Sequence, residues 1–288
     1  PIVIKADGLA AGKGVTIAHS AEEAHKALDD AMQKKIFGSA GTKVVIEDFL
    51  QGEEASFIVL CDGKKTIPFA SSQDHKARDN NDLGPNTGGM GAYSPAPIVT
   101  EEIHKQVMEK IIKPTIDGLK SEGITYKGFL YAGLMIKNSE ISVLEFNCRF
   151  GDPETQPILM RMESDLAEIC LLAAQGNLNE REISWTKDSA LGVVIASKGY
   201  PFEYEKNKEI NNLENENPRQ KVFHAGTKTQ EGKVLSNGGR VLCVTALGST
   251  LLDSKNLAYQ KVKNIDWKDG FYRDDICLLY TSPSPRDP

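Results

Sequence analysis

The sequence has few cysteines, no long apolar run and no excess of positive charge. Its five cysteines are scattered along 288 residues without a Cys-x-x-Cys pair, so neither a disulfide framework nor a thiolate metal site is indicated, and we expect free thiols in a reducing cytoplasm. No apolar stretch is long enough to cross a bilayer and no signal peptide opens the sequence, so we expect no membrane association. The net charge of -6 argues against nucleic acid and favours small-molecule partners.

The two ends of the sequence differ from the rest. It begins at Pro1 inside an apparent strand and without a start methionine, so we expect an N-terminal truncation. Residues 277–288 form a Pro/Ser-rich tail, which we interpret as translated cloning sequence; the alternative is a genuine disordered terminus.

Hydrophobic periodicity predicts an α+β protein. Strands are expected at residues 2–4, 15–18, 43–47, 55–60, 65–68, 128–137, 141–146, 193–196, 222–227 and 240–245. Helices are expected from residue 21 to about 35, and over 100–120, 154–175 and 250–264. The strands between 43 and 68 suggest an antiparallel meander, residues 79–97 a long polar loop, and the residues beyond about 192 a small separate α+β unit.

A glycine-rich turn joins the first two predicted strands. Gly8, Gly12 and Gly14 allow a tight turn whose N–H groups can approach phosphate oxygens, and Lys5 and Lys13 add positive charge. No Gly-Lys-Ser/Thr leads into a helix, so this is not a Walker A motif. We interpret it as a flap over a triphosphate; an ordinary hairpin loop is the alternative.

An acidic segment follows the third predicted strand. Glu47, Phe49 and Leu50 are placed to hold an adenine through a hinge, and Glu54 can accept the hydroxyls of a ribose. A solvated acidic turn is the alternative.

A polar segment and a glycine-rich loop form a third candidate. The segment contains Asp74, His75 and Lys76, and a loop rich in backbone donors suited to phosphate or carboxylate follows. The loop residues are Gly84, Pro85, Asn86, Thr87, Gly88, Gly89, Met90 and Gly91. Taken alone, a histidine beside an aspartate, such as His75 beside Asp74, is more often a structural pair than a catalyst.

The most specific motif is Glu145-Phe-Asn-Cys-Arg-Phe-Gly-Asp-Pro-Glu154. Alternation places Glu145, Asn147 and Arg149 on one face of a strand. The carboxylate and the amide are oxygen ligands suited to Mg²⁺, and Arg149 can hold a phosphoryl group bidentately. The intervening Phe146, Cys148 and Phe150 should point into the core; the alternative is a strand with a polar outer face.

Together these segments resemble the ATP-grasp superfamily and, within it, the glycinamide ribonucleotide synthetase (phosphoribosylamine–glycine ligase) family. The pieces that carry the resemblance are VIKADGLAAGKGV, SQDHKARDNNDLGPNTGGMGAYSP, GFLYAGLMI, EFNCRFGDPETQP, VFHAGT and NGGRVLCVTALG. The resemblance implies an ATP-grasp fold of two α+β lobes clasping ATP, followed by a small C-terminal α+β domain. The expected division is 1–49 for the rest of the small lobe, 50–187 for the large lobe, 188–276 for the C-terminal domain and 277–288 for the tail.

The resemblance also implies a reaction and roles for residues. The reaction joins glycine to 5-phosphoribosylamine with ATP and Mg²⁺ or Mn²⁺, through an acyl phosphate, in a cytoplasmic monomer. Lys5 and Gly8–Gly14 would hold phosphates. Glu47, Phe49 and Leu50 would hold the adenine, and Glu54, or Glu53 in its place, the ribose. Glu145 and Asn147 would hold the metal. Arg149 would steady the transferring phosphoryl group. Asp74, His75, Lys76, the 84–91 loop, Asp152, Pro153 and Glu154 would face glycine and the phosphoribosyl substrate.

Two other functions remain open at the level of the sequence. One is another ATP-grasp carboxylate–amine ligase or a carboxylase, against which the 84–91 loop argues. The other is an inactive nucleotide-binding module, which applies if the missing N-terminal region is required for turnover.

Overall fold

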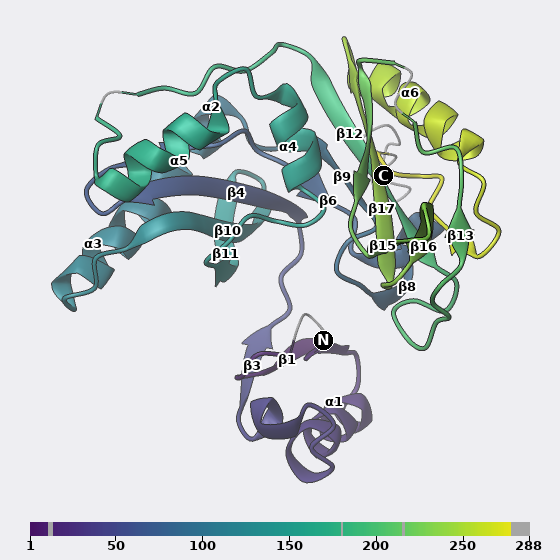
Figure 1. Ribbon diagram of the computed structural model, residues 1–288. Coiled ribbons are helices and arrows are strands. Elements are labelled where there is room, and N and C mark those ends of the chain that lie inside the picture. The colour runs from purple at the N-terminus through teal and green to yellow at the C-terminus, as the bar shows by residue number, and fades with distance from the viewer. Residues whose placement is uncertain (11–13, 180, 215–216, 278–288) are drawn as a thin grey trace. The chain divides into compact units, whose positions relative to one another are not determined.

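The computed structural model describes residues 1–10, 14–179, 181–214 and 217–277, and the chain divides into two units (Figure 1). The first unit comprises Pro1–Gly52 and Asn86–Gly88. Its antiparallel sheet has the order β2-β1-β3, with β1 at Ile2–Ala6, β2 at Val15–Ala18 and β3 at Val44–Asp48. Helix α1 (Ala21–Leu28) continues as a π-helical turn over Asp29–Gln33, and a 3-10 turn follows at Gly38–Gly41.

Helix α1 begins where the sequence predicts. The Ser20 hydroxyl accepts the N–H of Glu23 at 3.2 Å, and the Glu23 carboxylate accepts the N–H of His19 at 2.7 Å. These bonds satisfy N–H groups that a helix start otherwise leaves without partners. The helix packs Ala24 against Ile4 and Ala18 of the sheet, which form the buried centre of this unit.

The second unit contains two main sheets. The first has the order β11-β10-β4-β5. Its strands are β4 (Glu53–Asp62), β5 (Thr66–Pro68), β10 (Lys127–Lys137) and β11 (Glu140–Asn147). Side chains of β4 alternate between two cores: Phe57 and Val59 pack toward α2, whereas Ile58 and Leu60 pack toward α4 and α5. The sheet is therefore covered on both faces.

The helices that cover this sheet are short segments. They are α2 (Glu101–Val107), a π-helical turn at Met108–Ile112, α3 (Lys113–Ser121), α4 (Thr155–Arg161) and α5 (Leu166–Gln175). Pro114 is the second residue of α3, directly after the π-helical turn, in which Lys113 N–H bonds back to Met108 O. Between β10 and β11, Asn138 and Ser139 both have positive φ, as a two-residue hairpin turn requires.

The second sheet runs in the order β14-β17-β12-β9-β6, with β18 paired to β12. Its strands are β6 (Gln73–Asp74), β9 (Gly91–Ser94), β12 (Ser189–Ser197), β14 (Gln220–His224), β17 (Arg240–Gly248) and β18 (Gly270–Phe271). Helix α6 (Leu251–Asn264) packs on one face and α4 on the other (Figure 1). A Cβ at Gly192 would lie 3.0 Å from Cys243 Sγ and 3.1 Å from Thr245 Oγ1, both on the neighbouring strand β17, so the glycine leaves room for these two side chains.

Smaller elements complete the second unit. The three-stranded sheet β13-β16-β15 is formed by Glu209–Ile210, Lys233–Ser236 and Thr227–Gln230. A two-stranded ladder joins β7 (Ala77–Asp79) to β8 (Leu83–Asn86) around a 3-10 turn at Asn80–Asp82.

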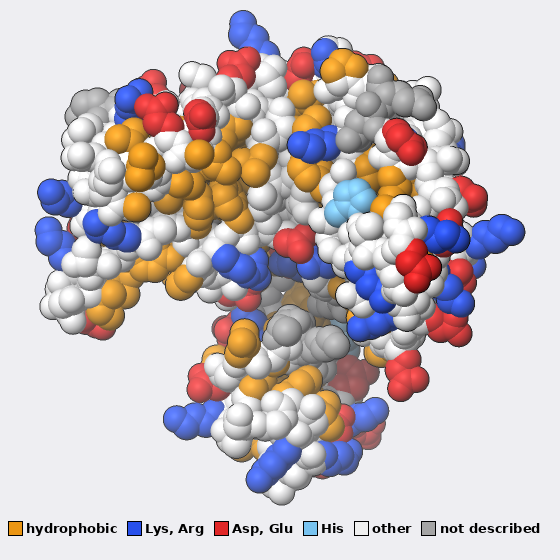
Figure 2. Space-filling view, in the orientation of Figure 1, with side chains coloured by type: hydrophobic (Ala, Val, Ile, Leu, Met, Phe, Trp, Pro, Cys, Tyr) orange, Lys and Arg blue, Asp and Glu red, His pale blue; other side chains and the backbone are white. Residues whose placement is uncertain are grey.

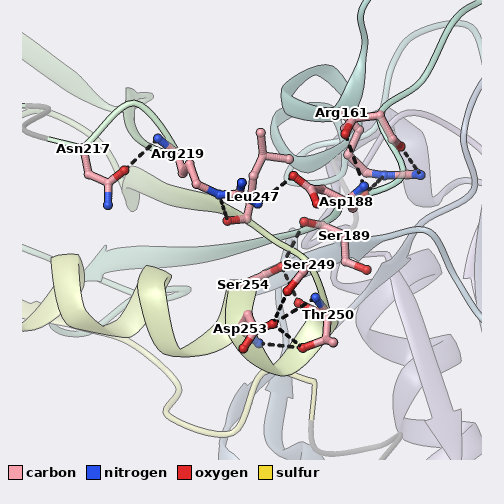
Figure 3. Close-up of polar contacts among 11 residues, drawn as sticks. Arg161, Asp188, Ser189, Asn217, Arg219, Leu247, Ser249, Thr250, Asp253 and Ser254 are labelled. Carbon is pink, nitrogen blue, oxygen red and sulfur yellow. Dashed lines mark hydrogen bonds and ion pairs between the residues drawn. The ribbon is translucent and has the colours of Figure 1, made fainter.

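Polar bonds fix the connection that leads into β12. Arg161 is 8% exposed and donates to Asp188 O at 2.7 Å and to Ser94 Oγ at 3.0 Å. Figure 3 shows Asp188 reaching in turn to Arg219, at 2.6 Å, and the start of α6 lying beside Ser189. At that helix start Thr250 and Asp253 form a capping box. The end of α4 and the start of α6 are thus tied to the same strand.

Most of the predicted elements are confirmed, and four expectations are wrong. Strand β3 pairs with β1 and not with β4, so residues 43–68 are not one meander. The expected 79–97 loop contains β8 and β9. The expected 154–175 helix is two helices, because Met162 leaves the helical region and the Asp165 carboxylate caps α5. The last sheet takes β6 and β9 from residues well before 188, so it is not built from the C-terminal residues alone.

The surface carries mixed charge. Figure 2 shows acidic and basic side chains interspersed over the face in view. Within the described ranges, none of the helices has the length and apolar character to cross a membrane.

A buried arginine ties the end of the chain to the segment after β6. Arg273 is 1% exposed and donates to both carboxylate oxygens of Asp275 at 2.7 Å, to Asp82 at 2.8 Å and to Ala77 O at 3.1 Å. Burial raises the pKa of Asp275, but the Arg273 guanidinium outweighs it and holds that pKa below its ordinary value. The bonds from Arg273 to Asp82 and to Ala77 O link positions almost 200 residues apart.

We therefore expect Arg273→Met to lower the free energy of unfolding by roughly 3–5 kcal/mol, because it leaves Asp275 buried without its cation. Urea denaturation measures the change. The matched control is Arg181→Met, which removes an arginine from an exposed ion pair with Glu168 and should cost less than about 1 kcal/mol. Equal effects of the two substitutions would contradict the prediction.

Candidate functional site

In the first unit, adjacent strands bring two predicted nucleotide residues together. Lys5 Nζ lies 2.5 Å from Glu47 Oε2, so β1 and β3 present one ion pair. Gly8 has no room for a side chain, because a Cβ would lie 2.6 Å from Ala40 Cα. Its N–H donates to Ala40 O at 3.0 Å, so this amide is used within the unit and not held open for a phosphate.

The other predicted nucleotide residues are placed less specifically. Gly14 is buried between Ala6 and Ala10, and Phe49 and Leu50 follow β3 as half-buried residues. Gly12 and Lys13 lie outside the described residues.

Strand β11 brings the two predicted metal ligands into contact. The amide Nδ2 of Asn147 donates to Glu145 Oε1 at 3.0 Å, so the two side chains share one face. The register of β10 and β11 shifts at Leu144, directly before Glu145, and such bulges re-aim the side chains that follow them. One carboxylate and one amide oxygen fit a Mg²⁺ ion that keeps several waters. Over the described residues, no group of three or more His, Cys, Asp or Glu forms a further metal site.

Arg149 lies just beyond this strand. Because β11 ends at Asn147, strand alternation does not place Arg149, and its alignment with the metal pair stays a prediction. Its Nη1 donates to Phe150 O at 2.7 Å, and its side chain is exposed.

Two of the three side chains expected in the core are not there. Phe146 is 42% exposed and Cys148 is exposed, because β11 is the edge strand of its sheet and its outer positions are not covered. Phe150 does pack inward, with ring centroids 3.9 Å from Phe129 and 5.3 Å from Phe69.

Glu154 is held by two hydroxyls that the sequence did not reveal. Its carboxylate is 2% exposed and accepts a hydrogen bond from Ser56 Oγ at 2.9 Å, while Tyr131 lies 2.8 Å from the same Ser56 oxygen. Burial, followed by the charges of Glu154 and Asp74, raises the pKa of Tyr131 well above its ordinary value. Tyr131 therefore stays protonated and can donate to Ser56, which in turn donates to Glu154.

Asp74, Lys76 and Glu54 extend this polar cluster. Lys76 Nζ is ion-paired with Glu54 Oε2. Burial raises the pKa of Asp74 to about 7; Lys76 opposes the shift, and Glu154 and Glu54 add to it. Burial lowers the pKa of Lys76, but Asp74 and Glu54 outweigh it and keep the ammonium charged. The cluster thus has more carboxylates than cations, a feature of sites that receive a positively charged group.

The 75–91 segment is held from both of its ends. Backbone bonds of 2.9 and 2.7 Å connect His75 with Gly91 and Met90. His75 is 1% exposed, and burial lowers its pKa to about 4, with Arg273 adding to the shift. The imidazole is therefore neutral and structural in character. Gly84 has positive φ, and a Cβ there would lie 2.3 Å from Asp79 Oδ2, so only glycine fits.

The structure also brings the glycine-rich loop to the 149–154 segment. A Cβ on Gly89 would lie 2.4 Å from Pro153 Cδ. Arg240, which the sequence analysis missed, donates to Asp152 O at 2.6 Å and pairs with Asp152 Oδ2 at 3.0 Å. Its position in the NGGRVL run gave only a weak signal, because the contact spans 88 residues.

Comparison with known proteins identifies the family. The phosphoribosylglycinamide synthetase ATP-grasp (A) domain matches residues 1–155, and the phosphoribosylglycinamide synthetase C domain matches residues 190–278. The chain belongs to the phosphoribosylglycinamide synthetase family. It is 57% identical over 279 residues to phosphoribosylamine–glycine ligase of Salmonella typhimurium and 54% identical over 277 residues to that of Pasteurella multocida. Each alignment covers 96% of this chain, which spans 65% of the length of either relative.

Solved structures of this family and of others share the fold. Phosphoribosylamine–glycine ligase from Thermotoga maritima superposes with a TM-score of 0.84 at 34% identity, covering 96% of this chain and 68% of that one. A biotin carboxylase domain of the Hydrogenobacter thermophilus 2-oxoglutarate carboxylase gives a TM-score of 0.71 at 14% identity, over 97% of this chain and 59% of that one. The second likeness concerns the fold alone. The expected ATP-grasp fold is confirmed.

The raised pKa of Asp74 makes a prediction about pH. Between about pH 4 and pH 7 the folded chain holds a proton on Asp74 that the unfolded chain has released. Asp74 should therefore contribute a fall of roughly 2–4 kcal/mol in the free energy of unfolding as the pH rises through this window without added metal. His75 contributes in the opposite direction, because its lowered pKa keeps it neutral in the folded chain while the unfolded chain still binds a proton. Asp74→Asn should remove the Asp74 contribution, so that its free energy of unfolding rises more, or falls less, with pH than that of the parent, as measured by urea denaturation at pH 5, 6.5 and 8.

The control for this measurement is Glu109→Gln, which changes an exposed helical carboxylate. It should leave the pH dependence as it is in the unsubstituted chain. The interpretation of Asp74 is wrong if the Asp74→Asn chain and the parent show the same dependence of stability on pH.

Proposed function

We propose that the protein joins glycine to 5-phosphoribosylamine with ATP, forming glycinamide ribonucleotide, ADP and phosphate. Membership of the phosphoribosylglycinamide synthetase family supports this, as do relatives that carry the name phosphoribosylamine–glycine ligase at 54% and 57% identity. The site residues support it through their chemistry, which is suited to moving a phosphoryl group and then accepting an amine.

The reaction would proceed in two steps. An oxygen of the glycine carboxylate attacks the γ-phosphorus of ATP, the bond to the β-phosphate oxygen breaks, and ADP leaves. The amine of phosphoribosylamine then attacks the carbonyl carbon of glycyl phosphate, loses a proton and displaces phosphate. The protein must position the partners, neutralise charge and exclude water, because an acyl phosphate is hydrolysed when exposed.

Each group of residues has a part in this scheme. Glu145 and Asn147 would hold Mg²⁺ or Mn²⁺, which when bound neutralises phosphate charge. The phosphates would be contacted by Lys5 and Gly8–Gly14, and the transferring phosphoryl group by Arg149. The nucleoside would be held by Glu47, Phe49, Leu50 and Glu54. The 84–91 loop and the Asp152–Glu154 segment would face glycine and the phosphoribosyl group.

The observation that carries the proposal is the excess of carboxylates around Asp74. Asp74 interacts with Glu54, Glu154 and Lys76, and Lys76 interacts with Asp74 and Glu54. Such a cluster favours ammonium and amine groups and opposes an anion such as bicarbonate. With a pKa of about 7, Asp74 can also accept the proton that the attacking amine releases. An amine ligase therefore fits the cluster better than a carboxylase does.

The wider assignments belong to the same proposal. We assign 1–49 and 50–187 to the two ATP-grasp lobes and 188–276 to the C-terminal domain. We also propose a cytoplasmic monomer, and the free cysteines of the described residues suit a reducing compartment.

The experiment that tests the function measures ADP release by this chain joined to the N-terminal segment of the Salmonella typhimurium relative. Release that requires both glycine and phosphoribosylamine supports the proposal. Release that responds to bicarbonate or to another amino acid, but not to glycine, would favour a different ATP-grasp enzyme. ATP binding without release under any of these conditions would favour a nucleotide-binding module.

In the same protein, Glu145→Ala should lower turnover by at least about 100-fold, because the metal loses its only carboxylate ligand on β11. The control is Glu140→Ala, an exposed glutamate at the start of the same strand, which should retain full turnover. Thermal unfolding of both variants checks that the fold persists. Undiminished turnover in Glu145→Ala would refute the metal assignment.

A further inference from the structure

A small cavity in the second unit lies beside the proposed substrate residues and has no role in the scheme above. It has a volume of about 240 Å³ and is lined by Arg78, Asp79, Lys198, Gly199, Tyr200 and Phe271. A water molecule occupies about 30 Å³ of liquid, so the cavity has room for a small organic molecule. Its walls come from β7, from the turn after β12 and from β18.

The shape of this cavity is fixed by backbone bonds. Lys198 N–H donates to Asp269 O at 2.9 Å, and Tyr200 N–H donates to Ser197 O at 3.0 Å. Gly199 has a φ of 99°, and a Cβ there would lie 2.0 Å from Glu203 O, so only glycine permits this turn. The turn brings a lysine and an aromatic ring to the same wall.

The side chains of Arg78 and Lys198 line the cavity, and each has hydrogen-bond donors that its contacts in the described structure do not use. Arg78 donates from Nε and Nη2 to the two carboxylate oxygens of Asp79 at 2.8 Å, and the remaining N–H groups of the guanidinium have no partner in the described structure. Lys198 Nζ donates to Lys268 O at 2.6 Å, which leaves two N–H donors. Since Asp79 balances one of the two charges, the lining carries a net positive charge. A phosphate monoester, with a charge near -2 and three acceptor oxygens, matches these groups.

The cavity lies close enough to Asp74 along the chain for one substrate molecule to reach both. Arg78 follows Asp74 by four residues, so their Cα atoms lie within about 14 Å of each other even if the chain is fully extended. Gly84 of the glycine-rich loop packs against Asp79, the partner of Arg78. A molecule anchored by a phosphate at Arg78 and Lys198 can therefore extend along this segment toward Asp74.

We propose that this cavity binds the phosphate of a pentose 5-phosphate, with Arg78 and Lys198 as its anchors and Tyr200 and Phe271 against the sugar. The proposal rests on the function proposed above, in which the phosphorylated pentose is the ribosyl part of the amine substrate. It assigns the phosphate to residues of the second unit alone.

Calorimetric titration of the chain with ribose 5-phosphate tests the assignment. Lys198→Met and Arg78→Met should each weaken binding by about tenfold or more, the usual cost of losing one charge-assisted hydrogen bond. The matched controls are Lys233→Met and Arg181→Met, which remove exposed, ion-paired cations elsewhere in the unit and should leave affinity unchanged. Ribose should bind far more weakly than ribose 5-phosphate. Inorganic phosphate should be weaker as well, but sensitive to the same two substitutions.

Two results would overturn the proposal. One is the lack of measurable binding of ribose 5-phosphate by the unsubstituted chain. The other is equal affinity in the unsubstituted chain and in both cavity variants. Inorganic phosphate that binds as tightly as ribose 5-phosphate would show a site for the free anion and would refute the pentose assignment.

The failure of this proposal and that of the proposed function can be told apart. In the chain completed with the Salmonella typhimurium N-terminal segment, glycine-dependent ADP release with an unchanged KM for phosphoribosylamine in Lys198→Met and Arg78→Met would refute the cavity alone. The lack of glycine-dependent release in the completed parent would instead refute the ligase function. A rise in KM for phosphoribosylamine, with the KM for ATP unchanged, supports both.

Discussion

Two backbone hydrogen bonds between Ser56 and Ser72, of 2.8 and 3.2 Å, join the two main sheets of the second unit. Ser56 belongs to β4 of the first sheet, and Ser72 directly precedes β6, the last strand of the second. The polar cluster lies at this junction, because the Ser56 hydroxyl reaches Glu154 and Asp74 follows Ser72 by two residues. If the junction moved, the carboxylates from β6 and from the 149–154 segment would no longer share one environment. The site therefore depends on how two sheets meet and not on either sheet alone.

The electrostatics of the cluster follow from that junction. Burying Asp74 and Glu154 close together, with the partly exposed Glu54 nearby, costs free energy, and Lys76 offsets only part of it. The protonation of Asp74 near pH 7 and the ion pair of Lys76 with Glu54 are two ways of lowering this cost. A bound amine or ammonium group is a third, which gives a physical reason for the proposed amine substrate. Functional sites often retain such unfavourable groups because binding depends on them.

The sequence predicted best what is local. The placement of Glu145 and Asn147 on one face of a strand and the start of helix α1 at Ala21 depend on neighbouring residues, and both are confirmed. Strand β9 was missed because Gly91-Ala-Tyr-Ser94 follows a run of glycines, and its strand character comes from pairing with β12, nearly 100 residues later. Phe146 was placed inside because alternation cannot tell an edge strand from a central one.

The same limit applies to the candidate site. The pairing of Glu145 with Asn147 could be predicted because the two lie on one strand. Ser56, Tyr131 and Arg240 could not, because each reaches its partner across a long stretch of sequence. A serine in an apolar strand is only a weak indication of a site residue, because the sequence does not show that Ser56 lies next to the buried carboxylate of Glu154.

The C-terminal residues have a larger part in the site than their distance in sequence suggests. Arg240 of β17 binds the backbone and the side chain of Asp152, directly before Pro153 and Glu154. Arg273 binds Asp82 and Ala77 O in the segment that leads to the glycine-rich loop. Each segment proposed to face the substrate is thus held by an arginine of the last sheet or of the residues after it. Because such bonds act only when both partners are in place, the order of the substrate segments requires the C-terminal part to be folded. The same dependence explains why β6 and β9, which lie early in the sequence, pair within the last sheet. The sheet that contains β17 is built partly from the strands on either side of the segment that the two arginines bind.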